Sequence, residues 1–182
     1  VYGQVQTLVN LGNVAWLLQD HDAALSFYQH GQAIVADLGD VKLEAQILRG
    51  LGDTYRSMGQ YVDAEHSLLQ AIDLKKHSGD LSCLKHTFMG LGALYHNLHR
   101  PQEAQKYYEL TLESARSQGD TRIESLTLYK LAALHMAQQQ FSECEHYLNQ
   151  AMKIATLYDY RDCLAQIHEQ FGDLELMKPE PD

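Results

Sequence analysis

Small residues recur at intervals of 40 positions along this 182-residue chain, and this interval limits what the chain can fold into. One series consists of four glycines and an alanine, each preceded by a large apolar residue: Gly12, Gly52, Gly92, Ala132 and Gly172. A second series of small residues keeps the same interval: Ala24, Ala64, Ala104 and Cys144. Repeats of 20–50 residues are typical of solenoids, in which each unit buries its apolar face against its neighbours. The sequence therefore predicts a repeating architecture.

Residues 41–80 indicate how one unit builds two helices. Apolar and aromatic residues recur there at helical spacing over 42–58 and again over 61–78. Asp40 is placed to cap the first helix, and Gly59 provides the turn before the second. Gly79 can close the second helix in the left-handed conformation. Gly52 and Ala64 are expected where the two helices approach most closely, because a larger side chain would overpack the contact.

The same plan extends over the whole chain. Helices are expected at about 3–19, 22–38, 42–58, 61–78, 82–98, 101–118, 122–138, 141–158 and 161–177. The last helix has no partner after it and is interpreted as a cap, whose apolar stripe covers the last repeat while its outer face meets water. We expect a single repeat domain over 1–178, with repeats at about 1–40, 41–80, 81–120 and 121–160, a capping helix at 161–177 and a frayed tail at 179–182.

Composition narrows the class of protein. Apolar residues make up 45% of the chain, but no apolar run reaches membrane-spanning length, so we expect a cytoplasmic protein without a membrane partner. The formal net charge of −10 argues against a direct nucleic-acid surface, which would be basic. Cys83, Cys144 and Cys163 are interpreted as small core residues. Because the chain begins at Val1 without a methionine, we expect it to be part of a longer protein.

The sequence contains no recognisable catalytic constellation. Its ten histidines include His96 and His99, three residues apart, but no Asp or Cys completes a metal set at a known spacing. A phosphate-binding glycine loop and a nucleophile elbow are also missing from the sequence. We therefore expect that the protein is not an enzyme and that it has no catalytic residue, no metal site and no cofactor.

The repeat resembles the tetratricopeptide repeat, whose signature places Leu-Gly, Tyr, Ala and an aromatic residue at fixed offsets. The second unit matches with Leu48, Leu51-Gly52, Tyr55, Gly59, Tyr61, Ala64, Leu68 and Ala71, and the third with Phe88, Leu91-Gly92, Tyr95, Ala104 and Tyr108. The resemblance implies an all-α, right-handed α-solenoid of four helix pairs plus a C-terminal capping helix. The repeat here is 40 residues instead of the usual 34 and is similar to the extended repeats of spindle-orientation adaptors, bacterial peptide-pheromone receptors and signal-sensing regulators.

In such arrays the first helix of each pair lines a concave groove, and the resemblance implies where a peptide would bind. The groove residues would be Gln6, Asn13, Trp16, Gln46, Arg49, Asp53, Arg56, His86, Met89, Leu126, Tyr129 and Met136. Amides and arginines can pair with a peptide backbone or a carboxylate. We expect a non-catalytic module, a monomer or weak homodimer, that binds a protein or peptide segment. The alternative is the ligand- or peptide-sensing domain of a larger transcriptional regulator or signalling protein.

Overall fold

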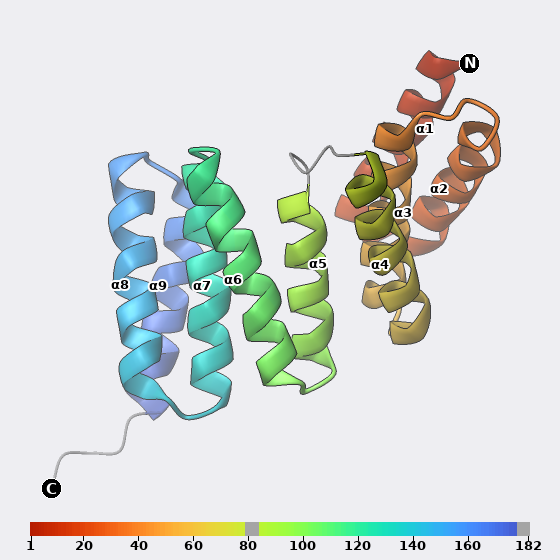
Figure 1. Ribbon diagram of the computed structural model, residues 1–182. Coiled ribbons are helices and arrows are strands. Elements are labelled where there is room, and N and C mark those ends of the chain that lie inside the picture. Colours follow the sequence, from red (N-terminus) through yellow and green to blue (C-terminus); the bar gives the residue numbers. More distant parts are fainter. Residues whose placement is uncertain (79–83, 178–182) are drawn as a thin grey trace, which may run out of the picture. The chain divides into compact units, whose positions relative to one another are not determined.

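The computed structural model describes residues 1–78 and 84–177, which form nine α-helices and no strand (Figure 1). The helices are α1 (Tyr2–Leu17), α2 (His21–Val35), α3 (Val41–Ser57), α4 (Tyr61–Ser78), α5 (Leu84–Asn97), α6 (Pro101–Ser117), α7 (Thr121–Ala137), α8 (Phe141–Leu157) and α9 (Arg161–Met177). The expected all-α fold is therefore confirmed, with helix ends shifted by up to three residues. Gly79, Cys83 and the expected tail at 179–182 lie outside the described residues.

The helices pack into two compact units, Val1–Leu98 and His99–Asp182. In the first unit α1 packs against α2 and α3 against α4, and in the second unit α7 packs against α8, as the repeat predicts. Each unit also joins neighbouring pairs, because α2 packs on α3, α4 on α5, α6 on α7 and α8 on α9. The boundary between the two units falls between α5 and α6. The expected single domain over 1–178 and the expected pairing of α5 with α6 in the third repeat therefore remain predictions. Within the described ranges, no helix is both long and apolar enough to cross a bilayer.

Aspartates cap the beginnings of several helices, and left-handed turns follow the ends of others, at positions that the repeat predicts. The side chain of Asp40 accepts a hydrogen bond from the backbone N–H of Leu43 at 3.0 Å, which confirms the predicted cap. Asp20 and Asp120 cap α2 and α7 in the same way. Left-handed φ angles of 77° and 66° at Gly59 and Gly119 reverse the chain between helices. These conformations cost a residue with a side chain about 1–2 kcal/mol, which glycine avoids.

The core of the first unit depends on close approach between helices. A buried cluster joins α1, α2 and α3: Val5, Val9, Ala15, Ala24, Tyr28, Val35, Leu43, Ile47 and Leu51. Within the pair α3–α4, a Cβ added to Gly52 would lie 2.6 Å from Cγ of Leu68 and 3.3 Å from the carbonyl oxygen of Ala64. The expected contact at Gly52 and Ala64 is thus present. In the second unit Cys144 and Cys163 are buried free thiols, as predicted.

Two glycines of the same series should respond in opposite ways to alanine. Gly52→Ala should lower the free energy of unfolding by about 1–3 kcal/mol, because the new methyl group overpacks the contact with Leu68. Gly172→Ala should raise it by about 0.5–1 kcal/mol, because a Cβ there meets no atom within 4 Å and alanine is the better helix former. Urea unfolding of both variants checks this, and equal effects would contradict the packing described here.

Candidate functional site

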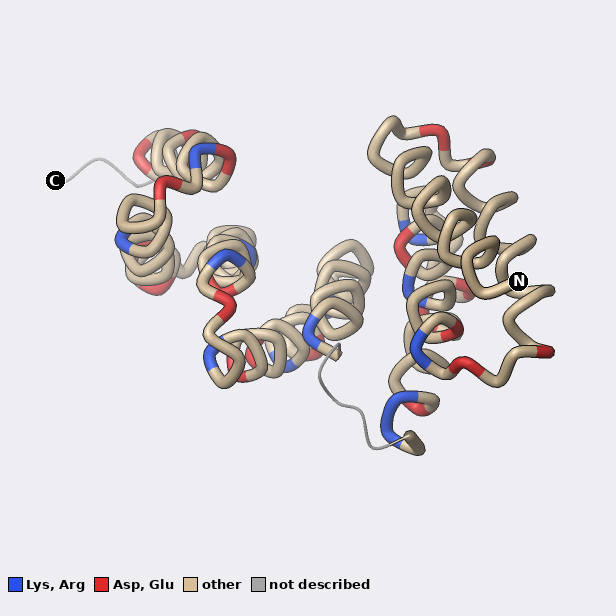
Figure 2. Tube along the Cα trace, turned by 90° about the horizontal axis from the view of Figure 1, so that it is seen from above, with Lys and Arg blue, Asp and Glu red and all other residues tan. Residues whose placement is uncertain are grey.

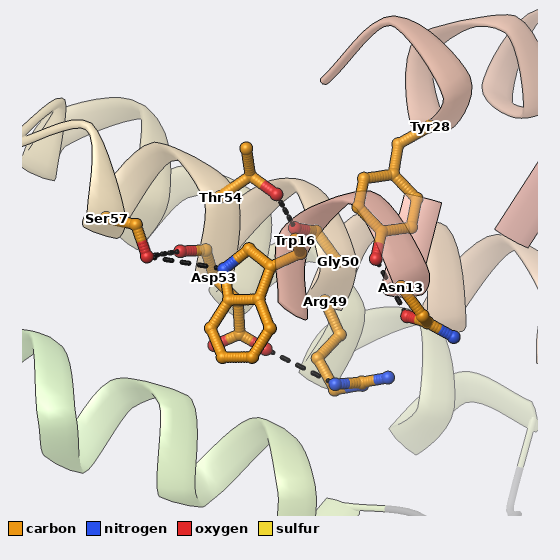
Figure 3. A network of polar contacts seen from close by, with 8 residues as sticks. All are labelled: Asn13, Trp16, Tyr28, Arg49, Gly50, Asp53, Thr54 and Ser57. Atoms are coloured by element: carbon orange, nitrogen blue, oxygen red, sulfur yellow. Dashed lines mark hydrogen bonds and ion pairs between the residues drawn. The ribbon is translucent and has the colours of Figure 1, made fainter. Parts of the chain in front are cut away.

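A pocket of about 270 Å³ opens in the first unit between α1 and α3, with α2 behind it. Seven residues line it: Asn13, Trp16, Leu17, Tyr28, Arg49, Gly50 and Asp53. Figure 3 shows six of them, with polar side chains of α1 and α3 turned toward one another. Four of the predicted groove residues therefore share one pocket.

Tyr28 forms the wall that α2 contributes, and it is almost completely buried. Its ring lies so close to α3 that a Cβ added to Gly50 would be 2.5 Å from it. The hydroxyl donates a hydrogen bond to Oδ1 of Asn13 at 2.7 Å. Burial raises the pKa of Tyr28 to about 12, with Arg49 acting in the lowering direction and Asp53 in the raising direction. The ordinary pKa of 10.0 already keeps a phenol protonated at neutral pH, and the raised value extends the pH range over which Tyr28 donates this hydrogen bond.

A second polar contact joins the C-terminal ends of α1 and α3. The indole Nε1 of Trp16 donates to Oγ of Ser57 at 3.3 Å, and that hydroxyl donates to the carbonyl oxygen of Asp53 at 3.0 Å (Figure 3). Trp16 is thereby held at the rim of the pocket with its ring half-buried. An aromatic side chain fixed at one end offers apolar area at little cost in conformational entropy.

The charged pair of the pocket is Arg49 and Asp53, one turn apart on α3. Nη1 of Arg49 lies 3.2 Å from Oδ2 of Asp53, and the side chains are 28% and 19% exposed. Burial raises the pKa of Asp53 above its ordinary value of 3.8, although the neighbouring positive charges of Arg49 and Arg56 act in the lowering direction. Desolvation of the carboxylate thus outweighs its ion pairing.

Two further polar side chains of α3 lie on the same face. Gln46, Arg49, Asp53 and Arg56 follow at intervals of three and four residues, which places them along one stripe of the helix. Within the part of the chain that the structure describes, Oε1 of Gln46 and Nε of Arg56 are buried and have no hydrogen-bond partner. A buried polar atom without a partner costs about 1–3 kcal/mol. The fold therefore leaves one acceptor and one donor of this stripe unsatisfied, while both side chains as a whole are half-buried and keep part of their surface in water.

The remaining predicted residues lie outside the pocket. In the first unit, Gln6 donates a hydrogen bond from Nε2 to Oδ1 of Asn10 at 3.3 Å, His86 is exposed and Met89 is half-buried. In the second unit Leu126, Tyr129 and Met136 are half-buried on α7.

Among the predicted residues of the second unit, Tyr129 has charged neighbours that can be named. The ammonium group of Lys130 lies 5.1 Å from its ring centroid. Burial is the main cause that raises its pKa, and the carboxylates Glu169 and Asp173 of α9 add to it. Tyr129 therefore has acidic neighbours on α9.

The sequence-based prediction of the site missed Tyr28 and Ser57. Tyr28 belongs to a second helix, and the prediction assigned the binding surface to first helices alone. The glycine at position 50, two residues before Gly52, is the signal that could have indicated a large side chain pressed against α3. In residues 1–78 and 84–177, no three His, Cys, Asp or Glu side chains gather in a way that could hold a metal ion.

The raised pKa of Asp53 predicts a pH dependence of stability. Because the folded state binds the proton more tightly than the unfolded chain, the contribution of Asp53 to stability falls as pH rises from 3.8 through the folded pKa. Above that range the cost of the buried charge is fully present. Asp53→Asn removes this titration, so the stability of the variant relative to wild type should increase as the pH rises from 3.8 through the folded pKa of Asp53 and then level off. Urea unfolding of both proteins at several pH values measures the difference, and a pH-independent difference would be the contrary result.

Comparison with known proteins places the chain in a family. The family model described as tetratricopeptide repeat matches residues 4–77 and 82–155. The regulatory protein RapK of Bacillus subtilis (strain 168) is 22% identical over 165 residues, which cover 88% of this chain and 44% of RapK. The chain thus spans less than half the length of this curated relative.

Two solved structures show the same fold. A Rap protein complexed with competence and sporulation factor matches with a TM-score of 0.80 and 15% identity, over 94% of this chain and 50% of that one. The Rap conjugation gene regulator of the plasmid pLS20, in complex with the Phr* peptide, matches with a TM-score of 0.70 and 17% identity, over 80% of this chain and 41% of that one. Since the family model covers most of its length, the chain belongs to the tetratricopeptide repeat family.

Proposed function

We propose that this chain is a non-catalytic module that binds an extended peptide segment along the first helices of its repeats. The observation that carries the proposal is the polar stripe of α3, with its neighbouring pocket. Gln46 and Arg56 bring buried polar atoms that lack a partner in the described residues, and Arg49 and Asp53 bring opposite charges that face the pocket. A peptide offers N–H donors and carbonyl or carboxylate acceptors together, and it can therefore pair with the accessible polar atoms of these four half-buried side chains.

The size of the pocket favours one side chain of a peptide over a cofactor. At about 270 Å³ it lies below the usual range of small-molecule sites, about 300–1,000 Å³. Trp16 and Leu17 supply apolar walls, and Arg49 supplies a forked donor for a carboxylate. We therefore expect a ligand residue with an acidic or amide end on a short apolar stem.

The second unit offers a different contact. Leu126, Tyr129 and Met136 present apolar area on α7, next to the carboxylates Glu169 and Asp173 that influence Tyr129. A ligand residue with an apolar body suits these side chains. This contact differs in character from the charged pocket of the first unit.

The comparisons support a peptide partner and also favour a second candidate function. One structural relative is in complex with a peptide, and RapK is named a regulatory protein. Because the chain covers 44% of RapK, we also consider that it is the sensing domain of a larger regulator. A sensor must change conformation on binding, whereas an adaptor need not. Small-angle scattering with and without peptide separates the two, since only the sensor predicts a changed scattering curve.

Replacing Arg49 should weaken peptide binding much more than folding. Arg49→Ala removes a charge-assisted hydrogen bond to the ligand, which is worth about 1.5–3 kcal/mol of binding free energy. The free energy of unfolding should change by less than about 1 kcal/mol, because the Arg49–Asp53 pair is partly exposed and Arg56 remains near Asp53. A peptide that binds the wild-type chain is first selected from a random display library. Calorimetric titration of this peptide into wild type and into Arg49→Ala then measures the two affinities.

Two further variants sharpen this experiment. Lys76→Ala changes the net charge by the same amount on the exposed surface of α4 and should leave the affinity unchanged. Tyr129→Ala tests the contact of the second unit and should also lower the affinity. If the selected peptide binds Arg49→Ala and Tyr129→Ala as tightly as wild type, the binding surface lies elsewhere.

A further inference from the structure

A second pocket of the first unit is formed by α2, α3 and α4. Its volume is about 390 Å³, and it shares no lining residue with the pocket that contains Arg49. Because α2 and α4 both pack on α3, the pocket is built from one first helix and the two second helices next to it. We call it the Glu44 pocket, and seven residues line it: Gln32, Glu44, Leu48, Gln70, Asp73, Leu74 and His77.

The Glu44 pocket is rich in hydrogen-bond acceptors. Glu44 of α3 is half-buried, and Asp73 of α4 is exposed. Within residues 1–78 and 84–177, neither carboxylate takes part in an ion pair or a hydrogen bond. Nδ1 of His77 donates to the backbone carbonyl oxygen of Asp73 at 2.7 Å, which leaves Nε2 of the neutral ring as a further acceptor. Three side chains of the pocket thus present acceptors to a ligand.

At the same place in the repeat, the second unit holds a guanidinium group. Glu124 of α7 stands 80 residues after Glu44, two repeats further on. Its Oε1 accepts a hydrogen bond from Nε of Arg116 of α6 at 2.8 Å, and the Glu124 side chain is 17% exposed. Arg116 corresponds to Ala36, which follows the last residue of α2 and keeps helical backbone angles. A methyl group therefore stands where the second unit supplies a cation to this glutamate.

Two further differences make the first unit more acidic at this place. Residues 1–41 contain no Lys or Arg, and in Figure 2 no blue appears on the two helices that follow the N label. No Lys or Arg of α2 can therefore pair with Glu44. On the other side of the pocket, Asp73 of α4 corresponds to Lys153 of α8. The first unit thus has two carboxylates where the second unit has one carboxylate and two cations.

A guanidinium group on an alkyl stem fits this lining. The group has five donors and no acceptor, and its planar fork can bond a carboxylate at two points. The buried Leu48 and the half-buried Leu74 provide apolar area for the methylene stem of an arginine. Gln32 and Gln70 each carry a donor and an acceptor, so they suit the peptide groups on either side of that arginine.

We propose that the Glu44 pocket binds an arginine side chain of a polypeptide partner. Glu44 and Asp73 bind the guanidinium group, and Leu48 and Leu74 contact its stem. The contact repeats the Arg116–Glu124 pair of the second unit, with the arginine supplied by the partner. The net charge of −10 favours the approach of such a cationic segment. Because the Glu44 pocket shares no residue with the proposed peptide site, either proposal can fail alone.

Titration followed by NMR tests the proposal with a capped arginine, N-acetyl-L-arginine N-methylamide. In amide spectra of the labelled chain, this probe should shift the signals of residues 44–48 and 70–77 and yield a dissociation constant. The capped citrulline of the same shape lacks the positive charge and should cause little shift. Butylguanidinium keeps the guanidinium and its stem but lacks the peptide groups, so it should bind more weakly than the capped arginine.

Variants of the pocket and a matched control locate the binding. Glu44→Gln and Asp73→Asn should each weaken binding of the capped arginine by about fivefold. Ala36→Arg should also weaken it, because the new side chain fills the pocket from within as Arg116 does at Glu124. Asp22→Asn makes the same charge change on an exposed residue of α2 outside the pocket and should keep the wild-type affinity. Circular dichroism melts check that each variant is folded.

Three results would overturn the proposal. The first is equal shifts with capped arginine and capped citrulline, or an affinity that none of the three pocket variants lowers. The second is an equal loss of affinity in Asp22→Asn, which would reduce the effect to the net charge of the chain. The third is butylguanidinium binding as tightly as the capped arginine, which would assign the pocket to a free guanidinium compound instead of a polypeptide.

Discussion

The ring of Tyr28 lies between two helices at positions where neither carries a side chain. A Cβ would lie 2.6 Å from the ring if added to Gly12 of α1 and 2.5 Å if added to Gly50 of α3. These two glycines let α1 and α3 close around α2, and the buried cluster of the first unit is assembled from these three helices. The position of the Tyr28 ring also shapes the pocket. The ring forms the rear wall, and polar side chains of α1 and α3 on either side of the ring form the rim.

Burial controls the electrostatics of that pocket more strongly than charge pairing does. Asp53 lies near two arginines, yet removal from water keeps its pKa above the ordinary value. A carboxylate held at such a cost is stabilised further by any group that brings additional hydrogen-bond donors. Burial acts on Tyr28 in the same direction, since it raises the pKa of the phenol that donates to Asn13. The pocket therefore combines fixed donors with a charge pair that a polar ligand can compete for.

The two ends of the array differ in a way that the repeat alone does not require. The face of α9 that a further helix would cover carries exposed glutamates, while α1 exposes leucine and valine at positions that are buried in later repeats. Nearest-neighbour packing explains why this matters: each helix of a solenoid is stabilised by the adjacent ones, so the chemistry of a terminal face determines whether it is stable in water or needs a partner. The face of α1 is mixed, because the exposed polar residues Thr7 and Asn10 lie beside Leu11 and Val14.

The sequence by itself determined the helices, their caps and the 40-residue unit, because helical periodicity and capping depend on residues close together in the chain. Asp40 and the close contact at Gly52 could be predicted for that reason. The tertiary structure alone decided which predicted site residues meet. Asn13 and Arg49 share a pocket while Gln6 and His86 do not, and Tyr28 enters from a second helix. It also decided that Gln46 and Arg56 hold buried, unsatisfied atoms within the described chain and that the pKa of Asp53 is raised. These properties arise from desolvation by neighbours distant in sequence, which no local pattern encodes.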